Sequence, residues 1–112
     1  MRLEARKYLY DIQEAANLAA QFTAGRDFAE YQTNTMLRLA VERAFSIMGE
    51  ALAQLAHFDS DLAERITDFR AIIAFRNILI HAYAQIDDRI VWGIVESKLP
   101  ALLREVNALM EE

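Results

Sequence analysis

The sequence predicts an all-α protein, and three observations lead to that prediction. The 112-residue chain has only three glycines and one proline, so few of its residues interrupt helices. Apolar residues recur every three or four positions along most of the chain, and almost no stretch alternates apolar and polar residues as a half-buried strand does. Hydrophobic residues make up 54% of the sequence, which suits one modest core. We therefore expect residues 1–112 to form a single domain of four or five helices.

Two long helices are expected in the first half of the chain. The first runs over about residues 3–24, and Gly25 is its expected end because glycine readily adopts the left-handed conformation that terminates helices. The second begins somewhere within residues 27–35. Its apolar stripe comprises Leu37, Val41, Ala44, Met48, Ala51 and Leu55. Gly49, inside this helix, is expected to permit close approach of another helix.

The second half begins with an interruption of the apolar pattern. Ser60 is expected to cap a short helix, with Glu64 at the position that a capping box uses. Residues 69–86 then predict a buried helix or two abutting ones. A further helical region opens at residue 87 or 88, and Pro100 should kink or restart it because proline cannot donate a backbone hydrogen bond.

The stretch FRNILIHAYAQID, residues 75–87, places polar side chains on the predicted buried helix. On a helical wheel Phe75, Ile78, Leu79, Ala82 and Ile86 share one face, which the core accounts for. A second face mixes aliphatic, aromatic and charged side chains, as a dimer interface does, and comprises Arg76, Ile80, Tyr83 and Asp87. Arg76 and His81 lie about 140° apart around an unbroken helix. Either this helix is distorted, or a two-fold axis brings the groups of two chains together.

Composition excludes several classes of site. Without cysteine the chain has no disulfide, thiolate metal site or cysteine nucleophile, and two histidines far apart in sequence, His57 and His81, make a metal site unexpected. The net charge of -5 gives no overall attraction to nucleic acid or to an anionic membrane. No apolar stretch approaches the roughly 20 residues that span a bilayer, and the N-terminus is charged, so we expect a soluble cytoplasmic protein.

Four residues of the quoted stretch carry a resemblance to a known family. Arg76, Asn77, His81 and Tyr83, at this spacing, resemble the signature of the HEPN superfamily and of its HepT-type toxin branch. The flanking segments are similar to the same family: YLYDIQEAANLAAQFTAG to its first helix, AVERAFSIMGEAL to its second, and IDDRIVWGIVESKLPALL to the segment after the motif. The resemblance covers nearly the whole chain. It departs at ERITDFRAII, where family members often carry a proline and a tryptophan.

The resemblance implies a fold and an activity. The fold is an up-and-down bundle of four or five helices that forms a homodimer, with the motif helices meeting at a two-fold cleft. The activity is metal-independent RNA cleavage by the toxin of a toxin-antitoxin pair, without a cofactor. Arg76 and His81 would be catalytic, Asn77 a supporting group, and Tyr83 the residue to which a nucleotidyltransferase antitoxin adds AMP.

The residue types agree with that chemistry. Cleavage of RNA without a metal requires activation of the ribose 2'-hydroxyl, which an imidazole can perform near neutral pH. The phosphorane that follows carries additional negative charge, and a guanidinium binds its oxygens with two parallel hydrogen bonds. His81 and Arg76 fit these two roles. An AMP group on Tyr83 would add bulk and a negative phosphate beside the arginine.

The residues also fit other interpretations. His81 could be a partly buried helix residue bonded to Asn77, Arg76 an ion-pair residue with Asp87 of another chain, and Tyr83 an interfacial aromatic. Two other classes of protein therefore stay open. One is a non-catalytic helical binding subunit that docks a nucleotidyltransferase. The other is a structural homodimer in which Arg76 and His81 only set the register of the interface.

Overall fold

Helices account for all the regular structure in the described part of the chain. The computed structural model describes residues 1–82, 84 and 86–112, and these residues form seven α-helices and no strand. The five longer helices are α1 (Leu3–Thr23), α3 (Thr35–Phe58), α5 (Phe69–His81), α6 (Asp88–Ser97) and α7 (Leu99–Met110). The two short ones are α2 (Phe28–Thr33) and α4 (Ser60–Glu64). The all-α prediction is confirmed. The number is higher than expected because α2 was not predicted and because the last helical region is divided into α6 and α7.

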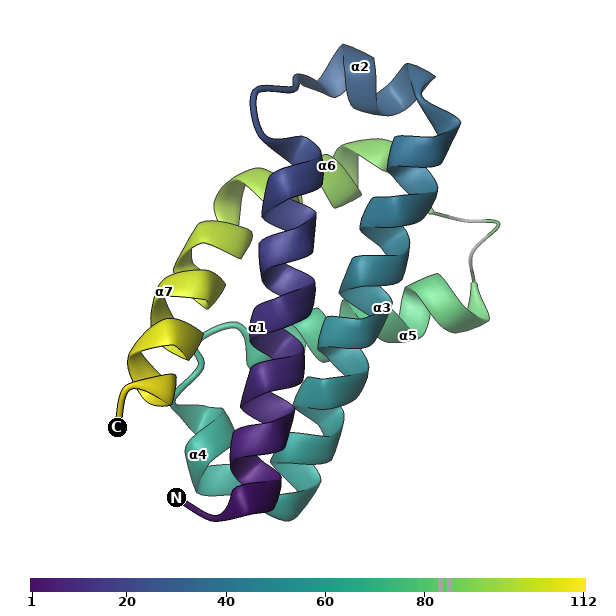
Figure 1. The fold of residues 1–112 in the computed structure, drawn as a ribbon. Helices are drawn as coiled ribbons and strands as arrows, with labels where there is room; N and C mark the ends of the chain where they lie inside the picture. The colour runs from purple at the N-terminus through teal and green to yellow at the C-terminus, as the bar shows by residue number, and fades with distance from the viewer. Residues whose placement is uncertain (83, 85) are drawn as a thin grey trace.

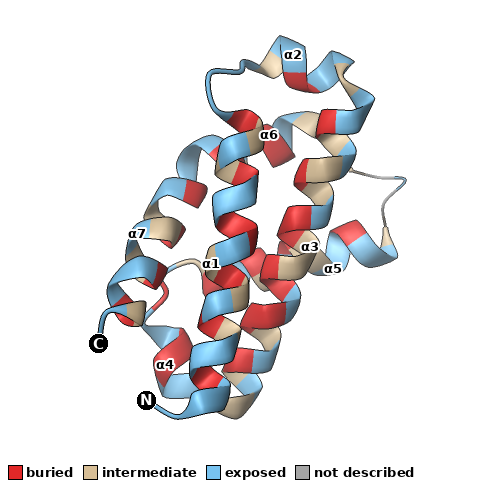
Figure 2. Cartoon of the chain, in the orientation of Figure 1, coloured by how far each residue is buried: buried red, intermediate tan, exposed pale blue. Residues whose placement is uncertain are grey.

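The helices form a bundle around the antiparallel pair α1 and α3 (Figure 1). α7 packs beside α1, and α5 packs on α3, behind it in this view. α2 spans the end where α1 finishes and α3 begins, and it contacts α6. The buried residues of α1, α3 and α7 lie on the sides that face one another (Figure 2). An amphipathic helix is stabilised mainly by this burial, so the apolar stripes of the sequence determine the packing.

Local signals set most helix ends. Gly25, after α1, has a φ of 71°, the left-handed conformation that favours glycine. The side chain of Asn34 accepts a hydrogen bond from the backbone N–H of Leu37 at 3.0 Å and caps α3. Asp87 caps α6 in the same way. Pro100 lies in the first turn of α7, where its missing N–H costs nothing, so it restarts the helix as predicted.

Three local predictions were wrong. Asp59, and not Ser60, caps α4, since its side chain accepts from the N–H of Leu62 at 3.1 Å. The motif helix does not continue to Ile86, because α5 ends at His81. Ile78 was assigned to the core face, but its side chain is 47% exposed. Ile80, which was assigned to the second face, is exposed to a similar extent, at 48%. The core contacts of α5 come from Phe69, Ile72, Phe75 and Leu79.

Trp92 of α6 is buried and its ring packs against Tyr31 of α2, with the ring centroids 5.4 Å apart. Burial raises the pKa of Tyr31, and the charges of Glu42 and Asp88 raise it further. This contact joins α2 to the beginning of α6, just after the motif segment. Among the helices of the described residues, none combines the length and the apolar character that crossing a membrane requires.

Candidate functional site

The motif side chains are carried by α5, which α3 holds in place. Phe69, Ile72, Phe75 and Leu79 of α5 are buried at helical spacing, and the ring of Phe75 packs edge-on against Phe45 of α3 with centroids 5.6 Å apart. This burial fixes the rotation of α5 about its own axis. Arg76 and Asn77 follow Phe75 directly, so their directions are determined by the core residues before them.

α3 and α5 cross with almost no space between them at Gly49. A Cβ atom built on Gly49 would lie 2.2 Å from the Cβ and 2.7 Å from the Cγ of Arg76, and 3.2 Å from the backbone oxygen of Ile72. Any side chain at this position would therefore force the two helices apart. This confirms the prediction that Gly49 permits close approach of another helix, and it shows that the partner is the motif helix.

The guanidinium of Arg76 is held by two neighbours. It forms an ion pair with Glu50, the residue after Gly49, and its Nη1 donates a hydrogen bond to Oδ1 of Asn77 at 2.7 Å. The side chain of Arg76 is only 19% exposed, and its Nε is buried without a hydrogen-bond partner in the described residues. A guanidinium has five N–H donors, so several remain for a further acceptor. The arrangement can bind an anion whose oxygen replaces that of Glu50.

His81 is the last residue of α5 and is exposed. Its imidazole makes no hydrogen bond with any other described residue. α5 is unbroken from Arg76 to His81, so the two side chains leave the helix about 140° apart. One chain therefore does not direct both side chains at one point. Tyr83 lies outside the described residues.

Within the chain, Arg76 and Asp87 have different partners. The Asp87 carboxylate accepts from the N–H of Arg89 at 2.8 Å and caps α6, and the alternative that pairs Arg76 with Asp87 of another chain stays a prediction. Glu50, to which sequence reasoning assigned no role at the site, is the ion-pair partner of Arg76 within the chain. The adjacent pair Gly49 and Glu50 was the available signal, since a glycine at a helix crossing places the next side chain beside the crossing.

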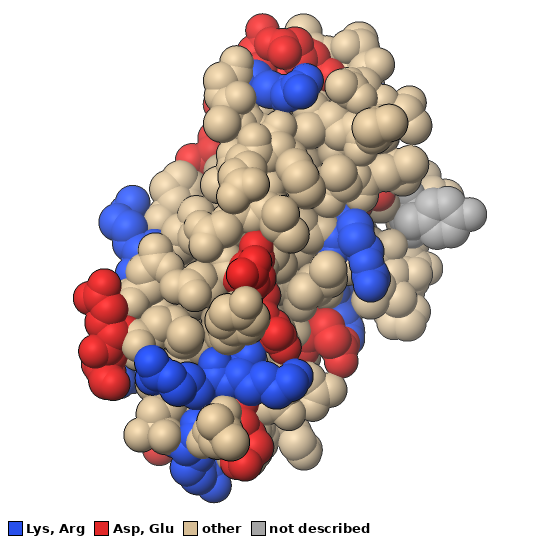
Figure 3. Space-filling model, in the orientation of Figure 1, with Lys and Arg blue, Asp and Glu red and all other residues tan. Residues whose placement is uncertain are grey.

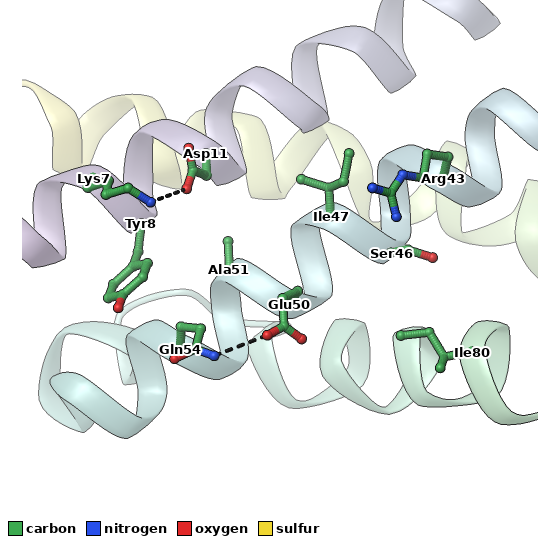
Figure 4. A pocket seen from close by; sticks show the side chains of 10 residues that line it. All are labelled: Lys7, Tyr8, Asp11, Arg43, Ser46, Ile47, Glu50, Ala51, Gln54 and Ile80. Atoms are coloured by element: carbon green, nitrogen blue, oxygen red, sulfur yellow. Dashed lines mark hydrogen bonds and ion pairs between the residues drawn. The ribbon is translucent and has the colours of Figure 1, made fainter.

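A groove of about 390 Å³ runs beside this crossing, between α1, α3 and the end of α5 (Figure 4). Arg43 and Ile80 lie at one end, and Lys7 and Tyr8 lie at the other. Glu50 lies between them and accepts a hydrogen bond from Nε2 of Gln54 at 3.0 Å. Asp11, Ser46, Ile47 and Ala51 complete the lining. The groove therefore shares Glu50 with the Arg76 ion pair.

Basic side chains gather in one band on the face that Figure 3 shows. The band crosses the lower part of the molecule, and acidic groups lie above and below it. Because the chain as a whole carries a net charge of -5, a polyanion would have to be bound by such local basic groups. Among the described residues, no three His, Asp or Glu side chains are grouped as a metal ion would require.

The whole chain is similar to proteins named as ribonucleases. The sequence model of the ribonuclease HepT-like family matches residues 12–109. A provisionally named RNase of Methanocaldococcus jannaschii is 37% identical over 106 residues, which are 93% of this chain and 94% of that protein. A protein of Thermococcus cleftensis, provisionally named ribonuclease HepT, is 33% identical over 102 residues, 91% of this chain and 92% of that protein. No solved structure matches the chain significantly.

The crossing at Gly49 can be tested with a matched pair of glycine variants. Gly49→Ala should lower the free energy of unfolding by about 1–3 kcal/mol, because the new methyl group overlaps the side chain of Arg76. Gly93→Ala, in α6, is the control: nothing lies within 4 Å of the added Cβ, so stability should rise by about 0.5–1 kcal/mol. Urea denaturation followed by circular dichroism measures both. Equal stability of the two variants would contradict the close crossing.

Proposed function

The chain belongs to the HepT-like ribonuclease family, and from this we propose that it is a toxin that cleaves RNA without a metal ion, through Arg76 and His81. The observation that carries the proposal is the state of Arg76. Its side chain is only 19% exposed, its first carbons are fixed at a helix crossing, and its guanidinium is held by a carboxylate and a carboxamide. It lies on the same helix as an exposed histidine.

Arg76 would bind the phosphate at the bond that is cleaved. Its first side-chain carbons are confined by Gly49, and a confined cation loses little conformational freedom when it binds an anion. Because the phosphorane carries more charge than the ground-state phosphate, the guanidinium would stabilise the transition state more than the substrate. Asn77 would hold the guanidinium in orientation through its 2.7 Å hydrogen bond.

His81 would transfer the protons. The 2'-oxygen attacks the adjacent phosphorus, and the bond from phosphorus to the 5'-oxygen of the next nucleotide breaks. A neutral imidazole takes the proton of the 2'-hydroxyl, and an imidazolium gives a proton to the leaving 5'-oxygen. The products are a 2',3'-cyclic phosphate and a 5'-hydroxyl. His81 is exposed, so its imidazole is accessible to a bound strand.

Two chains would supply these groups together. Arg76 and His81 leave one helix in different directions, whereas a two-fold axis would bring an arginine of one chain toward a histidine of the other. Apolar surface at this end of the molecule supports such a homodimer. Ile78, Ile80 and Ile90 are 47%, 48% and 58% exposed, and a hollow of about 200 Å³ lies between α5 and α6, lined by Phe75, Ile78, Ala82, Ile86, Asp87 and Ile90. Exposed apolar groups gathered in this way are typical of an interface.

A nucleotidyltransferase antitoxin would silence the ribonuclease by adding AMP to Tyr83. The phenol oxygen attacks the α-phosphorus of ATP, the α–β phosphoanhydride bond breaks, pyrophosphate leaves, and the phenol proton passes to a base. Tyr83 follows His81 by two residues, so the attached phosphate would lie close to the proton-transfer group. Its negative charge would then compete with the RNA phosphate for Arg76.

The ribonuclease activity is tested by incubating total cellular RNA with purified protein in excess EDTA. The wild-type chain should cleave the RNA, and His81→Ala should lower the rate by about 10²–10⁴-fold, since a positioned acid or base contributes that much. His57→Ala is the matched control, because His57 is an exposed histidine in the last turn of α3, and it should cleave at the wild-type rate.

Each variant must first show the circular dichroism and the sedimentation behaviour of the wild type. If His81→Ala cleaves as fast as His57→Ala, His81 has no part in the reaction. If the wild-type chain cleaves nothing but binds a nucleotidyltransferase, the chain is the non-catalytic binding subunit instead.

The proposed homodimer depends on the exposed apolar end of α5. Ile78→Glu should raise the dimer dissociation constant at least about tenfold, because a charge is buried in each half of a symmetric interface. Leu39→Glu is the control, since Leu39 of α3 is exposed, at 61%, but lines neither the hollow nor the groove. Sedimentation equilibrium measures both constants. A Leu39→Glu dimer that is weaker than the Ile78→Glu dimer would place the interface elsewhere.

The AMP addition is tested with the nucleotidyltransferase antitoxin that the proposal requires. Incubation with that enzyme and ATP should increase the mass of the wild-type chain by one AMP group, and the modified chain should no longer cleave RNA. Tyr83→Phe should gain no mass and stay active, because it lacks the phenol oxygen. Mass spectrometry of the intact protein measures the change, and Tyr10→Phe serves as the control, since Tyr10 is exposed on α1. Modification of Tyr83→Phe at the wild-type rate would exclude Tyr83 as the acceptor.

A further inference from the structure

The groove between α1, α3 and the end of α5 lies next to the proposed catalytic groups but has no role in the chemistry. Ile80, which forms part of its wall, immediately precedes His81. Glu50, also in the wall, is the ion-pair partner of Arg76. A ligand in this groove would therefore touch residues that adjoin both proposed catalytic side chains.

Among the described residues that line this groove, Arg43 is the cation without an ion pair. It is exposed, and its side chain forms no ion pair or hydrogen bond with another described residue. The other charged groups in the lining are occupied: Nζ of Lys7 lies 3.3 Å from the carboxylate of Asp11, and Glu50 binds Arg76 and Gln54. Arg43 thus presents its donors to whatever enters the groove, and a planar guanidinium matches the oxygens of a phosphate.

The remaining lining suits the other parts of a nucleotide. Ile47, Ala51 and Ile80 are apolar, and Tyr8 adds an aromatic ring, so a base or ribose would find apolar contact. Ser46 and Gln54 can donate or accept hydrogen bonds. The volume of about 390 Å³ lies within the range of about 300–1,000 Å³ that is typical of small-ligand sites.

The local charge also favours a phosphodiester strand here. The two cations of the lining, Lys7 and Arg43, balance the two acids, Asp11 and Glu50, and Arg76 behind Glu50 makes the local sum positive by one. The chain as a whole carries -5, so this region repels a polyanion much less than the average surface does. We propose that the groove binds the RNA strand beside the cleaved bond, with Arg43 on a neighbouring phosphate; this rests on the proposed ribonuclease function.

Glu50 occupies the position that a phosphate oxygen takes in the complex. Its carboxylate is the anion on Arg76 in the free chain, and its side chain is 50% exposed at the groove. A strand that enters the groove must therefore displace Glu50 from Arg76 before its phosphate can bind there. The carboxylate lowers the affinity for RNA, and its neutral amide would not compete as strongly.

RNA binding is measured by fluorescence anisotropy with a labelled single-stranded RNA of mixed sequence. All proteins carry His81→Ala, so that the RNA stays intact during the titration. Adding Arg43→Ala should raise the dissociation constant about tenfold and lower the slope of its logarithm against the logarithm of salt concentration by about 0.7, as expected for one lost phosphate contact on a single strand. Adding Glu50→Gln should lower the dissociation constant about three- to tenfold, a gain that a misfolded variant could not give.

Arg104→Ala is the matched control, because Arg104 is an exposed arginine of α7 that makes no ion pair with the described residues. It should bind RNA as the His81→Ala protein does. Equal affinities of Arg43→Ala and Arg104→Ala, no gain from Glu50→Gln, or no RNA binding at all would each overturn the groove proposal. The two proposals fail separately: a wild-type chain that cleaves RNA while Arg43→Ala binds normally leaves only the ribonuclease, and an inactive wild-type chain with the expected binding changes leaves only the groove.

Discussion

The close crossing of α3 and α5 at Gly49 is the contact on which the geometry of the motif helix depends. The carbons of the Arg76 side chain occupy the space that any side chain at Gly49 would need. Their position is thus set by the packing of two helices and not by the guanidinium's own interactions. Because Glu50 follows Gly49, its carboxylate lies beside the same crossing and forms the ion pair with the Arg76 guanidinium. One pair of adjacent residues in α3 therefore controls both the position and the charge environment of Arg76.

The ion pair also explains how the chain keeps the charge of a mostly buried arginine side chain when nothing is bound. The Arg76 side chain is only 19% exposed, and a charge that has lost part of its hydration requires an acceptor. Glu50 provides one in the free chain, and a phosphate oxygen could provide one in a complex. The acidic residue that stabilises the free fold is then also the residue that opposes binding, so stability and affinity are in conflict at this point.

The sequence predicted those features that depend on local patterns. Each of these features depends on residues that are close to it in the sequence. They are the apolar stripes of α1 and α3, the end of α1 at Gly25 and the restart of the helix at Pro100. α2 was missed because six residues are too few to show helical periodicity. α5 was extended too far because apolar residues continue at helical spacing beyond His81 in the sequence. The pairing of Arg76 with Glu50 joins residues of different helices, and helical spacing alone does not give the register between two helices.

The proposed chemistry requires a fixed group that binds the anion and an accessible group that transfers protons, and α5 carries the two at different places. A group that binds a developing anion works best when it is fixed before the substrate arrives, and Arg76 is fixed by α3. Protons are transferred at two oxygens on opposite sides of the phosphorus, and His81 is exposed at a helix end, where a bound strand has access to it. Five residues of helix turn these groups about 140° apart. The rigid helix that fixes Arg76 thus keeps His81 of the same chain away from it. A second copy of the chain is the simplest source of a histidine that lies close to Arg76.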